Sequence, residues 1–296
     1  MKKIPFLLLI LGVLLISFFC LKEIKRKSVS LKARKSAWNN LGYEIEKRIK
    51  NLKGRTGIFI EDLTTGWKIS FNHKEVFPAA SLIKLPIMLS CFYAIKEGKL
   101  NLKENVTLKP SDKVGGSGIL KNLPVGKTFT IERLLELMIT VSDNTATNLL
   151  IEKLGFEYLN LCFKKIGLKN TLLLRKMMDF QARKKRKENL TTAEDMASIL
   201  RRIYFKKFLN KSISQKCLQY LLHQKYRDRI PSKLPSGIKV AHKTGLERKI
   251  CHDAGLVFGP KGDFLIVVLT QGERIKKAKE FIAEISSLVY KYYGHF

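Results

Sequence analysis

A serine and a lysine three residues apart, Ser81 and Lys84, have a spacing that allows catalysis. Residues three apart share one face of a helix, so the lysine amine can approach the serine hydroxyl. Serine is a nucleophile only when a neighbouring base removes its proton, and lysine is such a base only when burial or a nearby cation lowers its pKa. The pair predicts acyl transfer, although Ser236 and Lys239 match the same spacing by chance.

Two further polar groups follow in the chain. The triplet 142–144 (Ser-Asp-Asn) comes directly after an apolar helical segment, and the triplet 243–245 (Lys-Thr-Gly) ends a predicted strand. Each triplet alone is typical of a helix cap or of a strand end with a turn. The three groups together, in this order, predict one catalytic site.

The elements that must position these groups come from both ends of the chain. Residues 57–62 and 68–72 alternate around a Thr-Thr-Gly turn, which predicts a β-hairpin, and helical apolar spacing begins at Ser81. Several helices follow, and three short apolar strands and an amphipathic helix close the chain. This order predicts an α+β fold, with an antiparallel sheet built from both chain ends, flanked by helices, and an inserted all-α subdomain.

We expect residues 1–36 to be an N-terminal segment and linker and residues 37–296 to be the catalytic domain. The sheet part is expected at about 37–75 and 236–296, and the helical part at about 76–235.

The three groups resemble the signature of the active-site serine penicillin-recognising enzymes, in particular the class A β-lactamase family. The residues around them fit as well. Phe77-Pro78-Ala79-Ala80 leads into Ser81, and Ala241-His242 precedes Lys243. The resemblance runs from about residue 50 to residue 290. It implies a serine hydrolase that acts on a β-lactam or on a D-Ala-D-Ala peptide and needs neither metal nor organic cofactor.

The resemblance also implies catalytic roles. Ser81 would attack the lactam or amide carbonyl, and Lys84 would accept its proton, with its amine kept neutral partly by Lys243. Ser142 would relay the proton to the leaving nitrogen. The backbone N–H groups of Ser81 and Leu246 would form the oxyanion hole.

Substrate-binding roles follow in the same way. Lys243 and Thr244, followed by Gly245, would hold the substrate carboxylate. Asn144 would bond to the side-chain amide of the substrate.

One part of the family pattern is broken. Class A β-lactamases carry an Arg-x-Glu-x-x-Leu-Asn loop whose glutamate activates the deacylating water. The matching stretch here begins at Arg175 and places Met177 at the glutamate position and Gln181 at the asparagine position. A thioether cannot accept a proton from water. Either Asp179 replaces the glutamate as base, or deacylation is slow and the natural substrate is peptidic; alternatively, Asp179 simply pairs with a basic neighbour.

Composition adds little about function. Fifty-six Lys and Arg against 25 Asp and Glu leave a net charge of +31, which attracts anionic wall polymers or lipid head groups but is also typical of a solvated surface. No nucleic-acid motif accompanies the charge. The five cysteines form no CxxC pair and are expected to be small buried hydrophobes.

The N-terminus predicts membrane attachment. An apolar run covers residues 4–21 behind two lysines and ends without a small-x-small cleavage site, which favours an uncleaved anchor over a cleaved signal. The basic residues after the run favour a cytoplasmic domain by the positive-inside rule. The expected action on a β-lactam or a D-Ala-D-Ala peptide favours an extracytoplasmic domain, which is our expectation.

Rival functions have weaker support. The segment 126–128 (Gly-Lys-Thr) lacks the leading glycine of a P-loop, because Lys121 stands there. A thiol enzyme built on Cys251 and His252 has no supporting motif. A membrane-tethered, non-catalytic penicillin sensor or wall-binding module is the main alternative to an enzyme.

Overall fold

The computed structural model describes residues 31–294. The expected membrane segment 4–21 and most of the expected linker lie outside this range. Residues 31–36 of that linker belong instead to a helix over 31–50. Within the described part, no helix combines the length and apolarity needed to cross a membrane.

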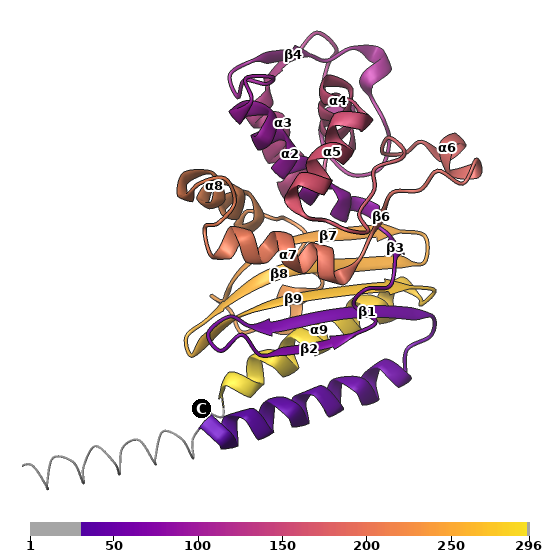
Figure 1. Cartoon of the computed structure of the whole chain (residues 1–296). Helices are drawn as coiled ribbons and strands as arrows, with labels where there is room; N and C mark the ends of the chain where they lie inside the picture. The colour runs from indigo at the N-terminus through magenta and orange to yellow at the C-terminus, as the bar shows by residue number, and fades with distance from the viewer. Residues whose placement is uncertain (1–30, 295–296) are drawn as a thin grey trace, which may run out of the picture.

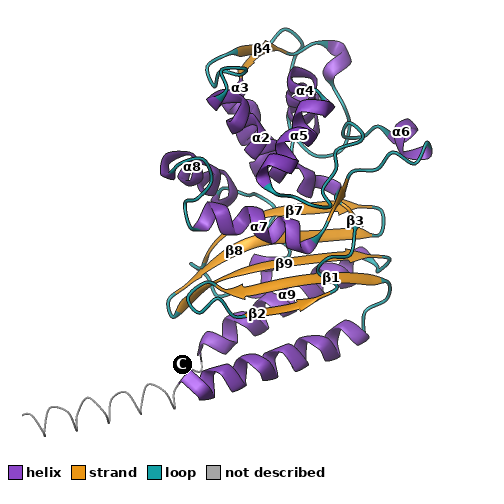
Figure 2. Cartoon of the chain, in the orientation of Figure 1, coloured by secondary structure: helices purple, strands orange, loops and turns teal. Residues whose placement is uncertain are grey.

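A five-stranded antiparallel sheet forms the base of the molecule (Figures 1 and 2), with strand order β2-β1-β9-β8-β7. Its strands are β1 (Arg55–Asp62), β2 (Lys68–Phe71), β7 (Lys239–Glu247), β8 (Ile250–Gly259) and β9 (Gly262–Gln271). Strand β1 pairs with β9 from Arg55↔Gln271 to Asp62↔Phe264, so the two chain ends meet in the middle of the sheet. The predicted fold class is confirmed.

Both faces of the sheet are covered, which explains why β9 is a continuous apolar run. Phe264, Ile266 and Val268 pack in one hydrophobic cluster with the helix over 31–50 and α9 (Ile275–Gly294). The alternate residues Leu265, Val267 and Leu269 pack in a second cluster, on the side of α7 (Ala193–Tyr204) and α8 (Lys211–Leu222). Side chains alternate between faces along a strand, so a strand covered on both sides is apolar at every position.

The helical part stands above one edge of the sheet (Figure 1). Its main helices are α2 (Lys84–Lys96), α3 (Ile131–Thr140), α4 (Asn144–Leu154) and α5 (Phe156–Ile166). The shorter elements of this part are α6 (Phe180–Lys184), β3 (Phe77–Pro78), β4 (Asn105–Thr107), β5 (Thr128–Thr130) and β6 (Leu190–Thr191), with 3₁₀ turns η1 (Ala80–Ile83), η2 (Pro110–Asp112), η3 (Leu120–Asn122) and η4 (Ile230–Lys233).

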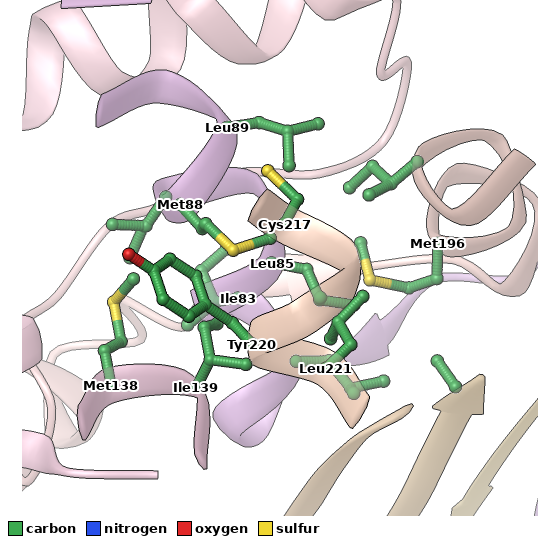
Figure 3. Packing of buried hydrophobic residues seen from close by; sticks show 14 of the residues in the cluster. Ile83, Leu85, Met88, Leu89, Met138, Ile139, Met196, Cys217, Tyr220 and Leu221 are labelled. Carbon is green, nitrogen blue, oxygen red and sulfur yellow. The ribbon is translucent and has the colours of Figure 1, made fainter. Parts of the chain in front are cut away.

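Helix α2 lies at the centre of this part, and ten of its thirteen residues are buried. Figure 3 shows its side chains surrounded by those of α3, α7 and α8. A helix that is apolar all round is a buried one. The residues that carry this packing are Leu85, Met88 and Leu89 of α2 with Met138, Ile139, Met196, Cys217 and Leu221 of its neighbours. The helix that follows Ser81 is therefore firmly held.

Candidate active site

Ser81 lies in the 3₁₀ turn η1 rather than in the first turn of an α-helix, so the expected helix start is displaced to Lys84. Ala80, directly before it, has a φ of 44°, in the left-handed region that non-glycine residues rarely adopt. Ser142 has a φ of 54° and Met178 a φ of 65°. Strained residues of this kind persist where the surroundings fix them, often at functional sites.

The three predicted groups meet around Lys84. Its Nζ donates to the Ser142 carbonyl oxygen at 2.6 Å and to Asn144 Oδ1 at 2.7 Å, and lies 3.1 Å from Ser142 Oγ. Burial, reinforced by the charge of Lys243, holds the pKa of Lys84 well below its ordinary value. A neutral amine in this place would donate its two N–H groups to these two oxygens and would turn its lone pair to the Ser142 hydroxyl.

Lys243 reaches the same hydroxyl from the other side. Its Nζ donates to Ser142 Oγ at 3.0 Å and to the Thr244 carbonyl oxygen at 2.8 Å. Burial and the nearby charge of Arg229 lower the pKa of Lys243 to about 7. Ser142 is thus a bridge between two amines, Lys84 and Lys243, along which a proton can move.

The nucleophile pair itself differs from expectation. Among the described residues, no hydrogen bond links Ser81 Oγ to Lys84, whose polar contacts go to Ser142 and Asn144. Catalytic hydrogen bonds are often loose without substrate and close when it binds. Asn144 is occupied as well, since its Nδ2 donates to the Gly115 carbonyl oxygen at 3.0 Å.

Asp143 fixes the loop that carries Ser142. Its Oδ1 caps α4 by accepting the N–H of Ala146 at 2.9 Å, and its Oδ2 accepts those of Ile119 and Leu120 at 2.7 and 2.9 Å. The carboxylate therefore ties the end of the Gly-rich stretch 115–118 to the start of α4. The sequence predicted the triplet but not this partner.

Two cavities meet at Ser81, and both also touch Ser117 and Leu246. The larger cavity, of about 290 Å³, is lined by Ser81, Gly116, Ser117, Asn144, Arg175, Met177, Met178, Phe180, Arg183, Leu246, Glu247 and Arg248. The smaller cavity, of about 220 Å³, is lined by Ser81, Ser117, Ser142, Tyr226, Asp228, Arg229, Thr244, Leu246 and Lys279.

The third triplet runs along β7 beside these cavities. Thr244 is buried in the wall of the smaller cavity, and Leu246 is 46% exposed at the junction of the two. Gly245 lies between them against β8, where an added Cβ would be 3.2 Å from His252 Cβ. Glycine here allows β7 and β8 to pack closely, so that Thr244 and Leu246 keep their places.

Met177 is buried in the wall of the larger cavity. Asn148 fixes its backbone twice, accepting its N–H at 2.7 Å and donating to its carbonyl oxygen at 3.1 Å. Asp179 does not line either cavity; its side chain caps α6 by accepting the Ala182 N–H at 2.9 Å. Among the described residues Asp179 forms no ion pair, so the alternative of a pairing with a basic neighbour has no support, and Gln181 is exposed on α6.

Two arginines and two glutamates hold this loop against the sheet. Buried Arg175 contacts Glu188 at 2.7 Å and Glu247 at 3.1 Å, while Arg183 contacts the same two carboxylates at 2.9 and 2.8 Å. Glu247 is the last residue of β7. The wall that carries Met177 is thereby attached to the strand that carries Thr244.

Comparison with known proteins agrees with the family resemblance found in the sequence. The model of the Beta-lactamase enzyme family (Beta-lactamase2) matches residues 40–293. The chain belongs to the β-lactamase enzyme family.

Several relatives of this β-lactamase family member are known. It is 26% identical over 278 residues to Beta-lactamase VEB-1 of Pseudomonas aeruginosa, covering 86% of this chain and 91% of the relative. It is 28% identical to the crystal structure of a β-lactamase from Sphaerobacter thermophilus, with a TM-score of 0.79 over 85% of this chain and 97% of the other. It is 29% identical to PBP-A, with a TM-score of 0.80 over 87% and 97%; a point mutant of PBP-A has been solved as an acyl-enzyme complex with penicillin G. This β-lactamase family member is thus a serine hydrolase of the β-lactamase and penicillin-binding superfamily.

Arg229 is a functional candidate that the sequence did not single out. It is buried in the wall of the smaller cavity, where its Nε contacts Cys251 Sγ at 3.2 Å and its charge lowers the pKa of Lys243. The stretch Asp228-Arg229-Ile230-Pro231 resembles the β-lactamase family, and that resemblance was the available signal. For Ser117, in the Gly-rich loop, the sequence offered no indication of a functional role apart from its glycine neighbours.

The thiol alternative is wrong. Burial raises the pKa of the Cys251 thiol and lowers the pKa of His252 to about 4. The His252 ring is held by the Pro78 carbonyl oxygen and the Thr270 N–H, and neither Cys251 nor His252 lines a cavity at Ser81. Four of the five cysteines are free and buried, as expected; Cys20 lies outside the described residues.

Proposed function

We propose that this chain is acylated by β-lactams on Ser81 and releases the acyl group slowly. One observation supports the slow release: Met177, which stands at the glutamate position of the family pattern in the sequence, lines the larger cavity. Without a base beside the ester, water is a poor nucleophile towards the acyl-enzyme.

The acylation step needs Ser81 Oγ to approach Lys84 Nζ when substrate binds, because no hydrogen bond joins them among the described residues. Ser81 Oγ attacks the lactam carbonyl carbon and forms an ester, and its proton passes to the neutral amine of Lys84. The lactam C–N bond breaks, and its nitrogen takes a proton from the Ser142 hydroxyl. Ser142 is replenished from Lys84 or Lys243, whose Nζ atoms lie 3.1 and 3.0 Å from its Oγ. The transfers between Ser142 and the two amines run over these two hydrogen bonds.

Substrate orientation follows from the smaller cavity. Thr244, Arg229 and Lys279 line it with a hydroxyl and two cations, a set suited to the carboxylate that β-lactams and D-Ala-D-Ala peptides share; Lys243, next to Thr244 in the chain, is fully buried. The backbone N–H groups of Ser81 and Leu246 supply the oxyanion donors. Asn144 lines the larger cavity, and it would have to exchange its bond to Lys84 or to the Gly115 carbonyl oxygen for one to the substrate amide.

Within residues 31–294, no free carboxylate in these cavity walls takes the place of the missing glutamate. The two carboxylates there are Glu247, paired with two arginines, and Asp228, which contacts Lys279 at 2.6 Å and Arg229 at 3.2 Å. Burial raises the pKa of Asp228, but these cations outweigh it and lower the pKa overall. A carboxylate held by cations is a weak base, and Asp179 is used as a helix cap.

A second candidate function is that of a penicillin-binding D,D-peptidase acting on D-Ala-D-Ala stem peptides. The cationic wall of the smaller cavity favours it, because a peptide C-terminus carries the same carboxylate. An N-terminal anchor over residues 4–21 would hold the domain outside the cytoplasm, near cell-wall peptides and anionic polymers. Protease protection in sealed spheroplasts tests that location, and a shielded C-terminal domain would contradict it.

The deciding experiment is intact-protein mass spectrometry of the full-length chain, sampled over time after mixing with benzylpenicillin, with Ser81→Ala as control. An adduct that forms and persists, and is absent in the variant, supports the proposal. An adduct that clears within seconds while penicillin is consumed indicates an efficient β-lactamase and contradicts slow release. No adduct would reject Ser81 as nucleophile and favour the non-catalytic sensor.

A further inference from the structure

Four consecutive cations stand where the chain turns at the end of α6: Lys184, Lys185, Arg186 and Lys187. Together they are called the basic turn below. All four are exposed, and within residues 31–294 none of their side chains has a hydrogen bond or an ion pair. The carboxylate that follows them, Glu188, is held by Arg175 and Arg183 at 2.7 and 2.9 Å. The basic turn therefore carries four uncompensated positive charges.

The backbone of the basic turn is ordered, although a run of like charges by itself favours disorder. The N–H of Arg186 donates to the Arg183 carbonyl oxygen at 2.9 Å, and the N–H of Lys187 donates to the Ala182 carbonyl oxygen at 3.0 Å. Arg186 has a φ of 61°, in the left-handed region that commonly ends a helix. Because the backbone holds the four charges next to one another, their mutual repulsion persists in the folded protein, and a bound anion would relieve it.

The basic turn suits a repeated anion better than a single one. A site for one phosphate usually offers several free backbone N–H groups. Here the N–H groups of Lys185, Arg186 and Lys187 are already bonded to carbonyl oxygens of α6. What remains is three ammonium groups and one guanidinium on successive residues. Both kinds of group bind phosphate oxygens, so a row of them fits the successive phosphates of a linear polymer.

The position of the basic turn favours a polymer over a membrane surface. In Figure 1, α6 and residue 31, where the described chain begins, lie at opposite corners of the molecule. An anchor before residue 31, as the sequence predicts, would leave the basic turn facing away from the membrane. A soluble or wall-bound polymer would reach it there, while the head groups of the anchoring membrane would lie on the other side.

The basic turn also belongs to the loop that forms a wall of the larger cavity. Phe180, at the start of α6, and Arg183 both line that cavity. Arg183 is attached to Glu247 of β7 at 2.8 Å. A polymer bound to the basic turn would therefore lie beside the larger cavity without entering it.

We propose that the basic turn binds a linear phosphate or phosphodiester polymer and holds the protein on it with the larger cavity alongside. This interaction goes beyond the proposed acylation and does not need Ser81. Each exposed contact strengthens binding by only about 1.4- to 5-fold, so the affinity comes from several contacts together.

The test is the fluorescence anisotropy of labelled long-chain inorganic polyphosphate, titrated with the full-length chain in a neutral detergent. The variant that combines Lys184→Gln, Lys185→Gln and Lys187→Gln should bind about tenfold more weakly at low salt. The slope of log affinity against log salt concentration should become shallower by about 2, because each phosphate contact contributes about 0.7, as for single-stranded nucleic acid.

The matched control combines Lys206→Gln, Lys207→Gln and Lys211→Gln, which removes three exposed lysines around the turn between α7 and α8. It lowers the net charge equally, and we expect it to leave the affinity within about twofold of the unmodified chain. Ser81→Ala should bind as the unmodified chain does, which separates this interaction from acylation. A circular-dichroism melt shows that each variant is folded.

Equal losses of affinity in the two triple variants would assign binding to net charge and overturn the inference, as would no binding of polyphosphate at all. Displacement of polyphosphate by inorganic phosphate at an equal concentration of phosphate groups would indicate a site for a single anion and contradict it. A loss seen only on vesicles of phosphatidylglycerol and phosphatidylcholine, and not on polyphosphate, would identify a lipid surface instead.

Discussion

Replacing Met177 by glutamate should shorten the lifetime of the acyl-enzyme that we propose on Ser81. The backbone at this position is held from both sides by Asn148, at 2.7 and 3.1 Å, so a new side chain there starts from a fixed point in the wall of the larger cavity. Glutamate has nearly the length of methionine. Its carboxylate would therefore enter the same cavity, beside the ester on Ser81.

The size of the effect follows from general base catalysis. A positioned base contributes about 10²–10⁴-fold to a rate, which corresponds to about 3–5 kcal/mol of activation free energy. The folded state is destabilised in return, because a buried carboxyl that lacks full hydrogen bonding costs about 1–3 kcal/mol. Burial also raises the pKa of the new carboxyl, so deacylation should be faster at pH 8 than at pH 6.

The assay is the lifetime of the benzylpenicillin adduct, followed by intact-protein mass spectrometry after excess penicillin is removed. Met177→Gln is the matched control, because it has similar size and polarity without a base. A circular-dichroism melt of each variant shows that it is folded. An unchanged adduct lifetime in folded Met177→Glu, or an equally shortened lifetime in Met177→Gln, would refute the reasoning. If the adduct lasts longer in Asp179→Asn than in the unmodified chain, Asp179 is already the base.

Two further predictions concern the groups around Ser142. Burial and the charge of Arg229 lower the pKa of Lys243 to about 7, so its proton is lost as the pH rises above 7, and with it the attraction for a substrate carboxylate that the family resemblance implies. The acylation rate constant should therefore fall on the alkaline side with an apparent pKa near 7, and a flat profile from pH 6.5 to 8.5 would contradict this. Asp143→Ala removes one helix cap and the acceptor of two more N–H groups, which should lower the free energy of unfolding by about 3 kcal/mol in urea titrations. Asp143→Asn, which keeps an acceptor oxygen, should lose clearly less, and equal losses would mean that the hydrogen bonds are not the cause.

The sequence was sufficient for the order of elements and for the residues that meet. The strands at both chain ends alternate or run apolar in the way that a covered sheet requires, and the three polar groups stand at the junctions of elements. Local patterns such as these depend on nearest neighbours along the chain, so they can be predicted without the tertiary structure.

The contacts within the site could not be predicted in the same way. The spacing of Ser81 and Lys84 suggested a direct hydrogen bond, but the Lys84 amine has better acceptors in the Ser142 carbonyl oxygen and Asn144, about 60 residues later in the chain. Asp179 suggested a base or an ion pair, yet an unsatisfied helix N-terminus lies next to it and takes its carboxylate. Side chains choose partners by tertiary proximity, which the sequence does not reveal.

The pairing of β1 with β9 also has a consequence for how the chain is made. Arg55 and Gln271, which contact each other at one end of this pairing, are 216 residues apart. At about 5–20 residues per second, a ribosome needs roughly 10–40 s to supply the second strand after the first has been made. During that interval the inner edge of β1 has no strand to pair with and is open to other extended chains. The yield of active enzyme would then depend on chaperone binding to this edge during synthesis as much as it depends on the stability of the finished sheet.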